Sequence, residues 1–122
     1  MSLVFVYGTL KRGGSNHSFL AGQGFLGDAR TVAGYRLFEL EGFPGMVALP
    51  DDRAGVSGEI WSVDEACLAE LDRLEGIDEG LYRRERVKLL APFANQAIET
   101  YIYARDIQGR RDLGSEWKNS PV

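Results

Sequence analysis

The chain has 122 residues, of which 44% are hydrophobic and 26% charged, and its formal net charge at pH 7 is -4. These values are typical of one globular domain with its own core, so we expect a single domain spanning residues 1–122. The net negative charge disfavours a nucleic-acid partner. The one cysteine can form neither an internal disulfide nor a cysteine-based zinc site.

No apolar run in the sequence reaches the roughly 20 residues that a membrane-spanning helix needs. The first ten residues are apolar, but they lack the positively charged start of a signal peptide and are interrupted by Gly8. We therefore expect a cytoplasmic protein without a membrane partner.

Predicted strands follow one another along the chain, separated by glycine-containing turns. Residues 3–7 are a continuous apolar run, rich in β-branched and aromatic side chains, which is typical of a strand buried on both faces. Residues 16–21 are compatible with a short helical turn. Further strands are predicted at residues 35–40, 46–49, 56–63, 82–90 and 98–104.

One segment has the periodicity of an α-helix. Asp64 is a suitable N-cap, and Glu65 is favourable in the first turn. Apolar side chains then recur at spacings of three and four up to residue 74, and Gly76 is a typical residue to follow a helix end. Many short strands and one helix predict an α+β fold, with a curled or barrel-like sheet and the helix packed on it.

Glu75 is the first candidate for catalysis. It lies four residues after Leu71 and seven after Leu68, so it shares the apolar face of the predicted helix. Partial burial and the negative end of the helix dipole would both raise the pKa of its carboxyl group. A carboxyl group with a pKa nearer neutrality suits general acid–base catalysis. The alternative is a rotated helix that leaves Glu75 as an ordinary solvated charge.

The second candidate site is the loop formed by Tyr7, Gly8, Thr9 and Leu10. It follows the first predicted strand, and a glycine-containing loop of this kind can present several backbone N–H groups to an anion such as a carboxylate. The spacing matches neither a P-loop nor a dinucleotide-binding motif. The alternative is an ordinary turn after a strand.

The remaining polar and reactive side chains favour structural roles. His17 is the only histidine, and the sequence contains no nucleophile-elbow motif to partner it. Cys67 lies on the apolar face of the predicted helix. Tyr101 and Tyr103 share one face of a predicted strand, and we assign Tyr101 and Trp61 to packing.

Three blocks of sequence carry a further signal. The first is LVFVYGTLKRG at residues 3–13, followed by Asn16 and His17. The second contains GEIWSVD at residues 58–64, LDRLEG at residues 71–76 and YRR at residues 82–84, and the third is YIY at residues 101–103. Together they resemble the γ-glutamylcyclotransferase-like superfamily, most closely its γ-glutamylamine cyclotransferase branch and bacterial relatives.

The resemblance implies a small mixed β-barrel with flanking helices, no metal and no cofactor. It also implies that the loop from Tyr7 to Leu10 holds the α-carboxylate of a γ-glutamyl group and that Glu75 is the catalytic glutamate. Tyr82 and Tyr103 match positions at which tyrosines of the family help to line the pocket. We expect a monomer whose partner is a small γ-glutamyl compound.

In the implied reaction, Glu75 takes a proton from the substrate's α-amine, which attacks the γ-carbonyl and releases 5-oxoproline and a free amine. Two other functions are compatible with the same residues. One is a non-catalytic module that binds a small carboxylate or an amino acid. The other is an amidohydrolase that uses water and releases glutamate.

Overall fold

A computed structural model describes residues 1–119 of the chain. It contains an eight-stranded mixed sheet, one α-helix, α1 (Glu65–Leu74), and two short 3-10 helices, η1 (His17–Leu20) and η2 (Ile77–Glu79). The strands are β1 (Ser2–Val6), β2 (Gly24–Arg30), β3 (Tyr35–Glu39), β4 (Pro44–Ala48), β5 (Ser57–Val63), β6 (Tyr82–Arg86), β7 (Ile98–Tyr103) and β8 (Asp112–Gly114).

Strand β7 organises the sheet because it pairs with three other strands. It runs parallel to β1, with Phe5 opposite Thr100, and parallel to β4, with Met46 opposite Ile102. Antiparallel β6 pairs along the whole length of β7 and therefore occupies its other edge. Strands β1 and β4 thus share one edge of β7, and we call the point where they separate the fork.

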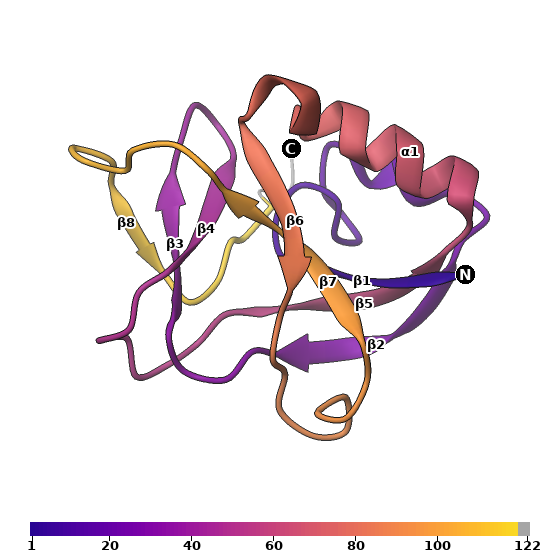
Figure 1. Cartoon of the computed structure of the whole chain (residues 1–122), viewed down its shortest axis with the longest axis horizontal. Helices are drawn as coiled ribbons and strands as arrows, with labels where there is room; N and C mark the ends of the chain where they lie inside the picture. Colours follow the sequence, from indigo (N-terminus) through magenta and orange to yellow (C-terminus); the bar gives the residue numbers. More distant parts are fainter. Residues whose placement is uncertain (120–122) are drawn as a thin grey trace.

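The fork divides the sheet into two wings, which Figure 1 shows on either side of β6 and β7. One wing is β1, β5 and β2, and the other is β4, β3 and β8. Within residues 1–119, the terminal strands β2 and β8 do not pair with each other, so the sheet is open. The α+β class is therefore confirmed, but the sheet is not closed into the small mixed β-barrel that the resemblance implied, and one α-helix flanks it within the described residues.

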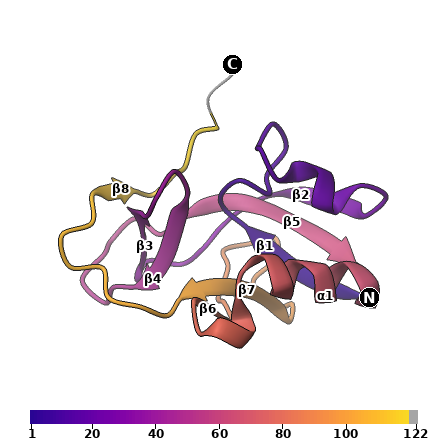
Figure 2. The same cartoon turned by 90° about the horizontal axis from the view of Figure 1, so that it is seen from above.

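Hydrophobic clusters cover both faces of the β1 wing. On one face, Val4 and Trp61 pack with Leu71 of α1, and on the other face Phe5 packs with Ile60. Strands β1 and β5 are for this reason buried on both sides, as predicted for β1. Figure 2, viewed from above, shows α1 running beside β1 and β5.

The helix begins and ends where the sequence predicts. The Asp64 side chain accepts a hydrogen bond of 2.7 Å from the Cys67 amide, which caps the N-terminus. Gly76 adopts φ 66°, a left-handed conformation that ends the helix directly after Glu75. The final turn of α1 is therefore fixed close to β6, where the chain re-enters the sheet at Tyr82.

The predicted strands are all present, with small shifts at their ends. The segment predicted at residues 82–90 leaves β7 after Arg86, and Leu89 then forms only an isolated bridge with Thr31. Strands β2 and β8 were not predicted. Among the helices of residues 1–119, none is long and apolar enough to cross a membrane.

Candidate active site

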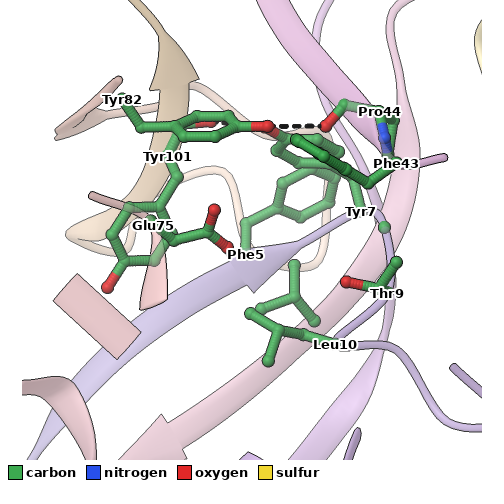
Figure 3. A pocket seen from close by; sticks show the side chains of 11 residues that line it. Phe5, Tyr7, Thr9, Leu10, Phe43, Pro44, Glu75, Tyr82 and Tyr101 are labelled. Carbon is green, nitrogen blue, oxygen red and sulfur yellow. Dashed lines mark hydrogen bonds between the residues drawn. The ribbon is translucent and has the colours of Figure 1, made fainter. Parts of the chain in front are cut away.

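A cavity lies at the fork, where the end of β1 and the start of β4 separate (Figure 3). Its wall combines β1 and the following loop, the β3–β4 turn, the end of α1, β6 and β7. Among the described residues, no lysine, arginine or histidine belongs to this wall. The lining residues are Phe5, Val6, Tyr7, Gly8, Thr9, Leu10, Phe43, Pro44, Glu75, Tyr82 and Tyr101.

Glu75 is the one carboxylate that residues 1–119 contribute to the cavity wall. Its backbone N–H still donates to the Leu71 carbonyl at 2.9 Å, so the residue belongs to the last helical turn. Figure 3 shows its carboxylate pointing into the cavity, between Tyr82 and Phe5. Burial among these rings raises the pKa of Glu75 to about 7. At neutral pH the group can therefore both accept and return a proton.

The tyrosines around Glu75 do not share this property. Burial raises the pKa of Tyr7, Tyr82 and Tyr101 above the ordinary value for tyrosine, and the neighbouring charge of Glu75 adds to each shift. Their hydroxyl groups stay protonated across the physiological range. Glu75 is thus the group in the cavity wall that changes charge near neutral pH.

The loop after β1 supplies the opposite wall. Within residues 1–119, the backbone N–H groups of Gly8, Thr9 and Leu10 donate to no protein acceptor. The carbonyl groups of the loop are held instead. Gly8 O accepts hydrogen bonds from the Lys11 backbone amide at 3.1 Å and from the Asn119 Nδ2 at 3.2 Å, and Thr9 O accepts from the Asn16 amide at 3.0 Å.

The anchored carbonyls determine which way the free N–H groups lie. In a trans peptide the C=O and N–H groups point in opposite directions, and both the Gly8–Thr9 and the Thr9–Leu10 bonds are trans. The N–H groups of Thr9 and Leu10 therefore lie away from the protein groups that hold the carbonyls. Several unpaired N–H groups in one concave loop form a typical site for a carboxylate or another anion.

Polar contacts of the buried Glu59 carboxylate attach Arg12, which lies just after this loop, to β5. The Glu59 carboxylate accepts hydrogen bonds from the Arg12 amide, the Arg12 Nε and the Trp61 Nε1, each at 3.1 Å. Its side chain is 8% exposed, so the ion pair with Arg12 is shielded from water on the carboxylate side. His17 Nδ1 lies 3.0 Å from the Leu10 carbonyl, in keeping with the structural role predicted for it.

The tyrosine hydroxyls in the wall are engaged with the protein. Tyr82 donates to the Pro44 carbonyl at 2.9 Å, and Tyr7 donates to the Tyr101 carbonyl at 2.6 Å. The Tyr101 hydroxyl donates to Asp72 of α1, at 2.8 Å, and Asp72 also forms an ion pair with Arg84 of β6. This network fixes the last turn of α1, and with it Glu75, against β6 and β7.

The structure thus brings together all the predicted site residues except one. Tyr103 is absent from the cavity wall and packs behind Tyr82, with their ring centroids 5.5 Å apart. Tyr101, which we assigned to packing, is both buried and part of the wall. Phe43 and Pro44 also belong to the wall and were not predicted as site residues.

A second hollow continues from the cavity toward the surface. It shares Thr9, Phe43, Glu75 and Tyr82 with the cavity wall, and its further lining residues are Ser15, Asn16, Gly42, Leu74 and Leu81. Glu75 therefore lies where an inner cavity meets an outer groove. Within residues 1–119, no group of three or more His, Cys, Asp or Glu side chains is arranged to hold a metal ion.

Comparison with known proteins places this chain in a family. Residues 4–119 match the family model described as gamma-glutamyl cyclotransferase, AIG2-like. A Vibrio cholerae protein named "Putative gamma-glutamylcyclotransferase" is 43% identical over 115 residues, covering 94% of each chain. The human gamma-glutamylaminecyclotransferase is 38% identical over 122 residues, covering 86% of this chain and 79% of its own.

Solved structures agree with the sequence comparison. The crystal structure of an AIG2-like protein from Mus musculus has a TM-score of 0.68 and 32% identity, covering 86% of this chain and 77% of its own. The chain belongs to the gamma-glutamyl cyclotransferase, AIG2-like family.

Proposed function

We propose that the protein converts a γ-glutamyl amine or a related γ-glutamyl compound into 5-oxoproline and a free amine, with Glu75 as general acid and base. The main support for this proposal is the position of Glu75, which has a pKa of about 7 and lies across the cavity from the loop after β1. The N–H groups of Gly8, Thr9 and Leu10 in that loop have no acceptor among residues 1–119. A γ-glutamyl group has an anionic carboxylate and a cationic amine on one carbon, which suits these two walls.

In the proposed complex the α-carboxylate of the substrate accepts hydrogen bonds from the N–H groups of Gly8, Thr9 and Leu10. The α-ammonium group then lies toward Glu75. The ionised carboxylate of Glu75 removes one proton from the ammonium group and leaves a neutral amine, which is the nucleophile. The absence of a cationic side chain from the cavity wall favours the approach of this ammonium group.

The amine nitrogen attacks the γ-carbonyl carbon, and a new C–N bond closes a five-membered ring. In the tetrahedral intermediate the ring nitrogen still carries two protons. Glu75 gives its proton to the leaving amine as the original γ-amide bond breaks, and it then accepts the second proton of the ring nitrogen, which leaves neutral 5-oxoproline. This second proton passes from Glu75 to the released amine, which departs as an ammonium ion. Because the nucleophile belongs to the substrate, the protein mainly has to hold it in a folded conformation. The outer groove beyond Glu75 would receive the leaving amine.

The test is the appearance of 5-oxoproline from a panel of γ-glutamyl amines and γ-glutamyl amino acids. We expect Glu75→Gln to abolish product formation while retaining ligand binding measured by calorimetry. Glu65→Gln is the matched control, because Glu65 is an exposed residue of the same helix, and we expect it to keep full activity.

Three outcomes would contradict the proposal. Full activity of Glu75→Gln would exclude the mechanism. Calorimetric binding without turnover by the wild-type protein would favour a non-catalytic binding module, and release of glutamate instead of 5-oxoproline would favour an amidohydrolase.

A further inference from the structure

The segment at residues 117–119 returns to the loop after β1. The Asn119 Nδ2 donates to the Gly8 carbonyl at 3.2 Å, and the Lys11 Nζ donates to the Trp117 carbonyl at 2.6 Å. The Trp117 side chain is itself held by packing against the cluster around Phe5. A segment more than 100 positions away in sequence therefore contacts both Gly8 of the loop and Lys11, the residue directly after it.

The amide of Asn119 is fixed at both of its ends. Its Oδ1 accepts a hydrogen bond of 2.9 Å from the Trp117 Nε1, while its Nδ2 donates to Gly8. Because an indole N–H can only donate, Trp117 determines that the NH₂ end of the amide faces the loop. The side chain is a specific donor aimed at one carbonyl.

The Gly8 carbonyl belongs to the same peptide group as the Thr9 N–H. A trans peptide places the two groups on opposite sides, so the contact from Asn119 holds the Thr9 N–H on the side away from the 117–119 segment. A carbonyl that accepts a hydrogen bond also polarises its peptide, which makes the N–H a better donor. Thr9 is one of the residues that line the cavity.

We propose that Asn119, oriented by Trp117, is a positioning residue for the anion-binding loop and sets the affinity for the substrate's carboxylate. This role rests on the proposed function, because it assigns a γ-glutamyl carboxylate to the loop. Asn119 does not belong to the cavity wall, so it acts through the Gly8–Thr9 peptide and not by direct contact.

The first measurement is amide hydrogen exchange in the ligand-free protein, which needs no turnover. The Lys11 amide donates to Gly8 and the Asn16 amide donates to Thr9, so both report on the loop. We expect both amides to exchange at least about threefold faster in Asn119→Ala and in the isosteric Asn119→Asp. Asn95→Ala and Asn95→Asp are matched controls in an exposed turn.

The second measurement is steady-state kinetics of 5-oxoproline formation. We expect KM to rise about three- to tenfold in Asn119→Ala, the equivalent of one hydrogen bond, with kcat within twofold of the wild type. Trp117→Phe keeps an aromatic ring but loses the Nε1 donor, and we expect a smaller rise in KM. A merely structural role would instead lower the melting temperature and leave KM unchanged.

The two measurements separate this proposal from the proposed function. Unchanged exchange of Lys11 and Asn16 in both Asn119 variants would overturn the positioning role, and so would faster exchange with an unchanged KM. If the wild-type protein forms no 5-oxoproline, the proposed function fails, and the exchange experiment alone decides whether Asn119 holds the loop.

Discussion

The hydroxyl of Tyr7 donates to the Tyr101 carbonyl at 2.6 Å and accepts from the Met46 amide at 3.1 Å, so one side chain joins β7 to β4 at the fork. These strands are paired at a single position, Met46 with Ile102. The Tyr7 hydroxyl therefore takes the place of the backbone hydrogen bonds that β4 and β7 do not form with each other at the fork, beyond the end of β1. Its ring at the same time forms part of the cavity wall.

We predict that Tyr7→Phe lowers the free energy of unfolding by about 1–3 kcal/mol, because a buried N–H and a buried C=O each lose a partner. Urea denaturation measures the change. Tyr35→Phe is the matched control, since the Tyr35 hydroxyl has no hydrogen-bond partner within residues 1–119, and its effect should be within about 0.5 kcal/mol. Equal effects of the two substitutions would show that Tyr7 does not hold the fork together.

Gly8 is predicted to tolerate no side chain. A Cβ at this position would lie 2.7 Å from Pro44 Cγ, much closer than two carbon atoms can pack, whereas a Cβ at Gly24 would find only an ordinary contact of 3.7 Å. We expect Gly8→Ala to displace the β3–β4 turn and reduce kcat/KM at least tenfold, with Gly24→Ala close to wild type. The measurement is 5-oxoproline formation together with the crystal structure of the variant. An unmoved Pro44 would contradict the argument.

The elements that sequence predicts well are those with local signals. Residues 3–7 form a dense apolar run, and α1 has a cap, a periodic face and a terminating glycine, so both follow from neighbouring residues. Strand β2 was missed because it is mostly exposed and contains a bulge between Phe25 and Gly27, which removes the alternation that marks a strand.

Closure of the sheet and the composition of the cavity wall depend on pairing between strands that are far apart in the sequence. The barrel prediction failed because β1 and β4 share one edge of β7, and no local pattern encodes that sharing. Glu75 and the loop after β1 were predicted from helix periodicity and a motif. Tyr101 joined the wall and Tyr103 did not, although both share a strand face, because the cavity ends behind Tyr82.

The titration of Glu75 should lower the free energy of unfolding as pH rises from about 4.5 to about 7. Its pKa is raised from 4.5 to about 7 in the folded protein, so the folded state binds more protons than the unfolded state between these values. Stability therefore falls as pH rises through this window, by at most about 3 kcal/mol, since one pKa unit corresponds to about 1.4 kcal/mol.

It follows that Glu75→Gln should stabilise the protein relative to wild type, and increasingly so from pH 4 to pH 8. Thermal unfolding across this range measures the difference. A constant difference between Glu75→Gln and wild type at every pH would mean that the carboxyl group titrates alike in both states.

The rate of the proposed reaction should depend on the same titration. Glu75 must be ionised to take the proton from the substrate, so kcat/KM should rise with pH with a midpoint at about 7. Because burial causes the shift, a polar substitution that admits water should lower this midpoint. Phe43 is a suitable position, since it is half-buried in the walls of both the cavity and the outer groove.

We expect Phe43→Ser to move the midpoint toward 4.5 by about one unit, whatever its effect on the maximum rate. The midpoints of the wild type and of Phe43→Ser are measured from the pH dependence of 5-oxoproline formation between pH 5 and pH 8.5, under the same conditions. A wild-type midpoint near 4.5 would show that the carboxylate is hydrated in the working enzyme. A midpoint near 7 that Phe43→Ser leaves unchanged would mean that a group other than Glu75 limits the reaction.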